Sequence, residues 1–120
     1  MKDYRELIVW QKSMELVKST YVLINKLPKD ERFALADQMR RSVISIPSNI
    51  AEGHERKSTK EYIQFLYIAN ASRAELATQL EICRMLEYLD NDVVDNAIRQ
   101  SGEIAKLINS IIKKLSQNNE

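Results

Sequence analysis

The stretch DVVDNAIRQSGEIAKLINSIIKKL, residues 92–115, decides the fold class of this chain. Its apolar and small residues recur in alternating steps of three and four, as Val94, Ala97, Ile98, Ser101, Ile104, Ala105, Ile108, Ile111, Ile112 and Leu115. Such spacing lines them up along one side of an α-helix, so it predicts a helix over residues 92–115 that packs one face against a core. Asp90, Asn91 and Asp92 precede the helix and are suited to capping its start.

The same spacing predicts three further helices. The first spans residues 6–26 and carries two apolar rows about 100° apart around its axis. The row that we expect to face the core is Leu7, Trp10, Met14, Val17, Tyr21 and Ile24. The second row, which exceeds what one core contact needs, is Val9, Leu16 and Leu23.

Breakers and caps set the boundaries of the middle two helices. Pro28 suits the start of a second helix over residues 29–52, and Gly53 suits the position just after a helix. Ser58 and Glu61 form a capping box that opens a third helix over residues 59–89. Because the connections are short, the sequence predicts one domain, residues 1–120, that is all-α: an antiparallel up-down-up-down four-helix bundle.

Composition supports this architecture and narrows the function classes. Only two glycines and two prolines occur in 120 residues, too few for the turns of an all-β fold. Lys and Arg total 18 against 17 Asp and Glu, so a nucleic-acid role requires local segregation of charge or an oligomer that repeats a modest patch. No stretch is apolar enough for a membrane span or a signal peptide, so we expect a cytoplasmic protein without membrane contact.

The residues that would support catalysis or metal binding are missing from the sequence pattern. Cys83 is the single cysteine and lies in an apolar helical run, which favours a buried structural thiol. His54 is the single histidine and has no Glu partner at the spacing of a carboxylate-bridged metal site. We therefore expect neither an enzyme nor a cofactor or metal site.

The segment RRSVISIPSNIAEG, residues 40–53, departs from local rules because Pro47 lies inside an apolar helical pattern. A proline removes one backbone donor and clashes with the carbonyl four residues earlier, so the second helix is predicted to kink there. Arg41, Ser45, Ser48 or Asn49, and Glu52 follow steps of three and four residues and form a polar stripe along one face. Two interpretations stay open: these side chains satisfy the disturbed backbone and pair with an arginine, or they line a binding groove.

Basic residues on either side of the kink are the candidates for nucleic-acid contact. Arg40 and Arg41 precede Pro47, whereas Arg56 and Lys57 lie in the following loop. Lys12 belongs to a weaker basic stripe on the first helix.

Several of these strings resemble the family of 23S rRNA intervening-sequence proteins, also called four-helix bundle or S23 ribosomal protein-like proteins. The matching strings are LIVWQK at 7–12, QMRRS at 38–42, SIPSNIAEG at 45–53, FLYIANAS at 65–72 and ELATQL at 75–80. Asn70-Ala71 departs from the glycine that such proteins often carry there. The resemblance, which is shared with the accessory protein of diversity-generating retroelements, implies a bundle that assembles into a ring of five copies and binds nucleic acid.

Two functional hypotheses follow. The first is a non-catalytic homo-oligomeric scaffold that binds structured RNA or DNA near the kink, with Val9, Leu16 and Leu23 at the subunit interface. The second is a ring that recruits a protein partner and makes no contact with nucleic acid.

Overall fold

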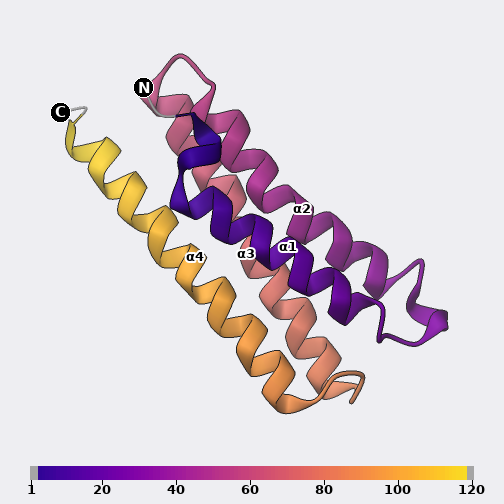
Figure 1. The fold of residues 1–120 in the computed structure, drawn as a ribbon. Coiled ribbons are helices and arrows are strands. Elements are labelled where there is room, and N and C mark those ends of the chain that lie inside the picture. Colours follow the sequence, from indigo (N-terminus) through magenta and orange to yellow (C-terminus); the bar gives the residue numbers. More distant parts are fainter. Residues whose placement is uncertain (1–2, 119–120) are drawn as a thin grey trace.

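A computed structural model describes residues 3–118, which fold into four α-helices and two 3-10 turns without a β-strand in that range. The helices are α1 (Ile8–Ile24), α2 (Leu35–His54), α3 (Thr59–Met85) and α4 (Asn91–Asn118). Figure 1 shows the chain reversing direction between consecutive helices. The prediction of an all-α four-helix bundle is therefore confirmed.

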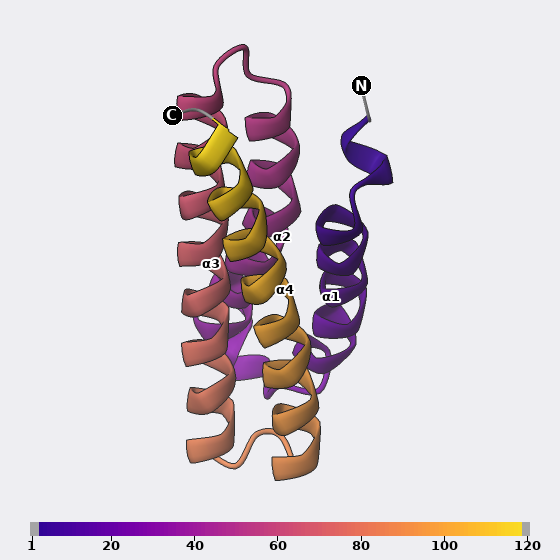
Figure 2. The ribbon, with the colours of Figure 1, turned by 90° about the vertical axis from the view of Figure 1, so that its left-hand side faces the viewer.

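The helices occupy the corners of an elongated bundle measuring 48 × 23 × 20 Å. Each helix contacts its two neighbours, and in Figure 2 α1 and α3 stand on opposite sides with α2 and α4 between them. One end of the bundle holds the α2–α3 connection, the start of the chain and the last turn of α4, while the other end holds the remaining two connections. The core contains apolar side chains from all four helices.

The orientation of α1 differs from the prediction. Val9, Leu16 and Leu23 are only 2%, 0% and 9% exposed and lie in the chain's own core, so the prediction that they form a subunit interface is wrong. Met14, from the row expected to face inward, is 42% exposed, and Trp10 is half-buried. The second row is therefore the innermost one, and the exchange with the expected row holds at Met14 and in part at Trp10, whereas Ile24 of the expected row is buried as predicted.

Two hydroxyl residues explain the exchange. Ser13 and Thr20 complete the Val9–Leu16–Leu23 row at steps of three and four, and both are fully buried. The Ser13 hydroxyl donates to the Val9 carbonyl oxygen at 2.7 Å, so this polar group enters the core without losing its hydrogen bond. A row that looked interrupted in sequence is thus continuous in space.

The starts of α1 and α2 are later than predicted because a 3-10 turn precedes each helix. Leu7 is extended and separates the turn Tyr4–Glu6 from α1, and the Asp3 carboxylate caps that turn by accepting from the Arg5 backbone N–H at 2.8 Å. The turn Lys29–Glu31 follows Pro28, and α2 begins only at Leu35.

Helix α2 continues through Pro47 to His54, and the bend expected at the proline stays a prediction. The expectation that Gly53 follows the helix is wrong, because Gly53 lies inside α2 with a negative φ. Its role is to allow close approach: a Cβ at Gly53 would lie 2.6 Å from the Cβ of Phe65 and 3.2 Å from Cδ1 of Tyr62. The missing side chain lets α2 and α3 meet at this end.

Helix α3 begins as predicted and ends four residues early. The Ser58 hydroxyl accepts from the Glu61 backbone N–H at 3.1 Å, which confirms Ser58 as the cap. At the other end Glu87 has a φ of 61°, and the Tyr88 N–H donates to the Cys83 carbonyl at 2.9 Å. This is a Schellman ending, in which a left-handed residue stops the helix.

Candidate interaction surfaces

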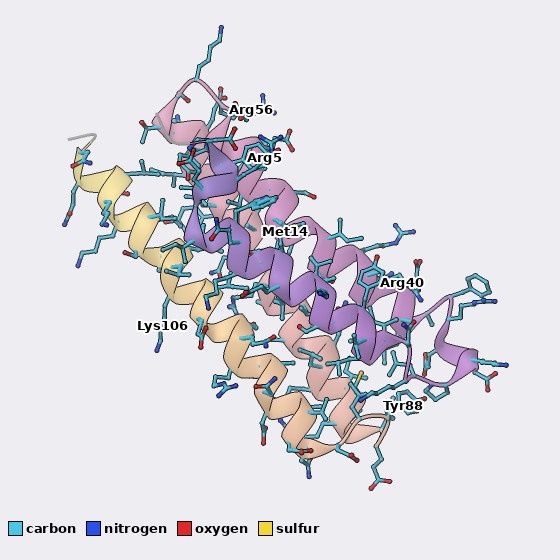
Figure 3. All side chains as sticks on the ribbon, viewed as in Figure 1. Arg5, Met14, Arg40, Arg56, Tyr88 and Lys106 are labelled. Carbon is cyan, nitrogen blue, oxygen red and sulfur yellow. The ribbon has the colours of Figure 1, made fainter. Side chains whose placement is uncertain are left out.

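An apolar groove runs between α1 and α2 on the outside of the bundle. It has a volume of about 370 Å³ and is lined by Tyr4, Trp10, Met14, Val17, Ile44, Pro47, Ser48 and Ala51. Met14 and Ile44 are 42% and 44% exposed, although they are large and apolar. We call this surface the α1/α2 groove; Figure 3 labels Met14 on the outward side of α1.

The groove follows from the way in which α1 and α2 pack. Because Val9, Leu16 and Leu23 fill the core, the Trp10–Met14–Val17 row is displaced toward α2 and remains partly open. The Tyr4 and Trp10 rings pack edge to face at 5.5 Å and form one wall. The Ser48 hydroxyl donates to the Ile44 carbonyl at 2.9 Å, so the only small polar side chain in the lining is already hydrogen-bonded.

Sequence reasoning missed this groove, since it placed Trp10 and Met14 in the core. The signal that would have found it is the Ser13–Thr20 pair, which marks the second row as the inward one. The Ser13 hydroxyl bonds the carbonyl four residues earlier, whereas Thr20 Oγ1 is buried without a hydrogen-bond partner among residues 3–118.

Three of the five predicted nucleic-acid contacts are held in ion pairs. Arg41 Nε lies 3.3 Å from Asp37 Oδ2, and Lys12 Nζ lies 4.0 Å from Glu15 Oε2. Arg56 Nη2 lies 3.0 Å from Glu52 Oε1, and its guanidinium carbon sits 4.8 Å from the centre of the Phe65 ring. Each of these cations has part of its charge offset by a neighbouring carboxylate.

The five residues also lie apart. Figure 3 shows Arg40 and Arg56 toward opposite ends of α2, and the helical rise from Arg40 to His54, the last residue of α2, alone amounts to about 21 Å. Lys57 belongs to the loop beyond α2, and Lys12 lines a polar hollow with residues of α4. The structure therefore does not gather the predicted residues into one basic patch.

Ser45 of the polar stripe beside Pro47 faces α3, whereas Glu52 lines a separate hollow with Tyr4 and Arg56. Ser45 Oγ lies 2.8 Å from Ser72 Oγ, and Asn49 Nδ2 donates to both the carbonyl and the hydroxyl of Ser45 at 2.8 Å. With the Glu52–Arg56 pair, these contacts match the structural interpretation of the stripe. The carbonyl that Asn49 satisfies is that of Ser45, however, and not that of Val43, which loses its donor to Pro47.

Cys83 has surroundings that suit a structural role, whereas His54 Nδ1 is buried without a hydrogen-bond partner among residues 3–118. Cys83 is fully buried with its sulfur 3.7 Å from Met39 Sδ, and burial, with a further contribution from the Glu31 charge, raises the pKa of the thiol to about 11. A thiol that stays protonated at neutral pH is a poor nucleophile. His54 packs edge to face on Tyr62 at 5.7 Å, at the rim of a polar hollow beside the α2–α3 connection.

The described part of the chain contains neither a metal-binding cluster nor a helix that could span a membrane. Among residues 3–118 no group of three or more His, Cys, Asp or Glu side chains is placed to hold a metal ion. Across those same residues, no helix has both the length and the apolar character needed to cross a membrane.

Comparisons with known proteins match nearly the whole chain. The family model described as 23S rRNA-intervening sequence protein matches residues 5–110. A solved structure of a protein of unknown function from the S23 ribosomal protein family of Bacteroides thetaiotaomicron is 32% identical, with a TM-score of 0.83. That similarity covers 88% of this chain and 99% of the other. No curated protein is significantly similar to the chain.

Proposed function

This chain belongs to the family of 23S rRNA-intervening sequence proteins, and we propose that it is a non-catalytic scaffold that assembles into a homo-oligomer and presents repeated nucleic-acid-binding surfaces. The observation that carries the proposal is the open α1/α2 groove, with Met14 and Ile44 more than two-fifths exposed. A monomer with a complete core of its own has no need to leave this apolar surface in water.

A second copy of the chain is the occupant that we propose for the groove. Ile68, Met85 and Leu86 of the α3 region are 47%, 71% and 45% exposed. Apolar side chains point in several directions around α3, whereas in α4 they keep to one side. Helices with apolar residues on more than one side are usually covered on more than one side. The part of the outer surface of α3 that carries Ile68 and Leu86, about 100° around the helix from Tyr67, therefore suits the groove of the next copy.

This pairing determines the kind of assembly. The groove and the outer surface of α3 are different parts of one molecule, so the contact is heterologous, and each copy binds one neighbour through each surface. Such contacts form a closed ring when the rotation between copies divides a full turn. The proposed assembly is a ring, with five copies as the number that the family resemblance implies.

A ring that recruits a protein and makes no contact with nucleic acid is the second candidate. The observation in its favour is that Lys12, Arg41 and Arg56 are each paired with a carboxylate. Recovery of protein but no RNA or DNA after crosslinking in cells would favour this candidate over the first.

Sedimentation velocity at micromolar protomer concentration tests the assembly. The wild-type chain is expected to sediment as an oligomer, and the double variant Met14→Glu/Ile44→Glu as a folded monomer, because two carboxylates would be buried in an apolar contact. Lys18→Glu is the matched control, since Lys18 is exposed on α1 and lies outside the groove. A monomeric wild-type protein, or a double variant that assembles as the control does, refutes the proposal.

A further inference from the structure

The surface between α3 and α4 collects positive charge beyond the ion pair of Arg84 with Asp95. Arg84 of α3 marks where these helices meet, because its guanidinium contacts Asp95 of α4 at 2.6 Å. Lys106 and Lys113 lie about three and five helical turns beyond Asp95, on the same side of α4. Both lysines are exposed, and Figure 3 shows Lys106 projecting away from the bundle.

Arg73 forms the centre of this surface. It reaches from α3 to α4, where its Nη1 donates to Ser101 Oγ at 3.3 Å, and its Nε donates to Asn70 Oδ1 at 2.8 Å. No carboxylate of residues 3–118 forms a salt bridge with it, and partial burial lowers its pKa. Two neutral partners fix the guanidinium while leaving its remaining donors free for an anion.

The acidic residues of these two helix stretches face elsewhere. The Glu75 carboxylate accepts from Ser42 of α2 at 2.6 Å, and Glu61 points within about 40° of the direction of Glu75 around α3. Glu103 lines the hollow shared with Lys12 and Glu15 of α1. Charge is thus segregated across the helices although the whole chain carries a formal charge of only +1.

We infer that this surface binds the phosphate backbone of single-stranded nucleic acid. We call it the α3/α4 cationic face and define it by Lys60, Tyr67 and Arg73 of α3 with Lys106 and Lys113 of α4. Its cations span about 18 Å along α4, from the level of Ser101 to Lys113. Tyr67, 58% exposed on the outward side of α3, supplies the aromatic platform on which a base stacks.

The composition of the cationic face favours nucleic acid over other polyanions. A membrane surface would require apolar side chains beside the lysines, and the residues between Lys106 and Lys113 on this side of α4 include Asn109 and Ser110 instead. An acidic peptide would satisfy the charges but would leave Tyr67 without a stacking partner. Free phosphate would engage Arg73 alone and gain nothing from the lysines.

The inference deepens the proposed scaffold function by locating its ligand, and it rests on that function only for the gain in affinity from repeated copies. Assembly and nucleic-acid binding can be tested separately. The groove variant Met14→Glu/Ile44→Glu keeps the cationic face, so its monomer is expected to retain the salt dependence of binding per protomer even though avidity is lost.

Fluorescence anisotropy with a labelled 20-nucleotide oligouridylate is the test, from 50 mM to 200 mM salt. Four phosphate contacts predict a slope of about −3 for log K against log salt, and Lys106→Gln/Lys113→Gln should reduce it to about −1.4. The same relation makes each contact worth about eightfold at 50 mM, so the double variant should bind about 65-fold more weakly. Lys18→Gln/Lys29→Gln removes equal charge elsewhere and should change binding about twofold.

Variants of Tyr67 and a second probe test the ligand class. Tyr67→Ala should weaken RNA binding at least about fivefold, while Tyr67→Phe, which keeps the ring, should bind as the wild type does. A labelled 20-residue glutamate peptide should bind more weakly than the RNA. Absence of RNA binding at 50 mM salt, equal losses in the two lysine double variants, or equal affinity for the peptide would overturn the inference.

Discussion

Replacing Gly53 with alanine is the most direct test of how α2 and α3 fit together. The new Cβ would stand 2.6 Å from the Cβ of Phe65, 3.2 Å from Cδ1 of Tyr62 and 3.3 Å from its carbonyl oxygen. Carbon atoms pack best at about 3.5–4.0 Å, so the two helices must separate by roughly 1 Å at this point. The Phe65 Cβ cannot rotate away because it is attached directly to the backbone.

The expected change in the free energy of unfolding is the sum of two opposing effects. Overpacking a tight contact costs about 1–3 kcal/mol, and a clash with a backbone-attached atom belongs at the upper end of that range. Alanine restores about 1 kcal/mol through its higher helix propensity. Gly53→Ala should therefore lower the free energy of unfolding by about 1–2 kcal/mol, or the melting temperature by about 3–10 °C.

Gly102 provides a matched control within the same chain. It lies inside α4, and a Cβ added there would have no neighbouring atom within 4 Å. Gly102→Ala should therefore raise the free energy of unfolding by about 1 kcal/mol. Urea unfolding followed by circular dichroism, at one fixed protomer concentration, measures both variants. The reasoning fails if Gly53→Ala is as stable as the wild type, or if both variants are destabilised equally.

Three further predictions follow from the same structure. Glu87→Gly should raise the free energy of unfolding by about 1 kcal/mol in urea, because Glu87 adopts a φ of 61°, whereas Glu87→Ala should bring no gain. Leu16→Glu should abolish the helical circular dichroism signal at temperatures where Met14→Glu keeps it, because Leu16 is 0% and Met14 42% exposed; equal signals would contradict the assigned orientation of α1. Cys83 has a folded-state pKa of about 11, above the unfolded value of about 8.5, so its protonated form contributes stability that is complete below pH ~8.5 and is lost as pH rises toward 11. Unfolding free energies of the wild type and Cys83→Ala, compared at pH 8 and pH 11, should show the extra loss only in the wild type.

The helices themselves could be predicted because their signals are local. The row from Val94 to Leu115 lies on one face of α4, and the Ser58 cap depends on residues only three apart. Such features are determined within one or two turns of the helix, so neighbouring sequence contains the information.

The orientation of α1 and the role of Gly53 could not be predicted in the same way. Both apolar rows of α1 satisfy helical spacing, and only the positions of α2 and α4 decide which row is covered. A glycine is typical of the position just after a helix, but Gly53 is needed here because Phe65 on another helix leaves no space for a side chain. In each case the deciding contact joins residues that are distant in sequence.

The predicted basic residues lie apart for a reason that helix geometry explains. Arg40 and Arg56 were grouped because both lie near Pro47 in the sequence, yet the part of α2 from Arg40 to His54 alone spans about 21 Å, and Arg56 lies beyond it. Arg73 and Lys106, in contrast, are far apart in sequence and belong to adjacent helices, with Arg73 bonded to Ser101. A surface built from two helices appears only once their pairing is known.

The segment around Pro47 has two faces that contact different parts of the molecule. This double role is a physical reason why its sequence places a proline inside a helix. Residues one position apart on a helix point about 100° apart, so neighbours in the sequence lie on different sides of the helix. Ser45, Asn49 and Gly53 form the side that packs tightly on α3. Ile44 and Pro47 line the α1/α2 groove. The unusual sequence thus combines a tight helix contact with an open apolar surface, and substitutions on its two faces should affect folding and assembly separately.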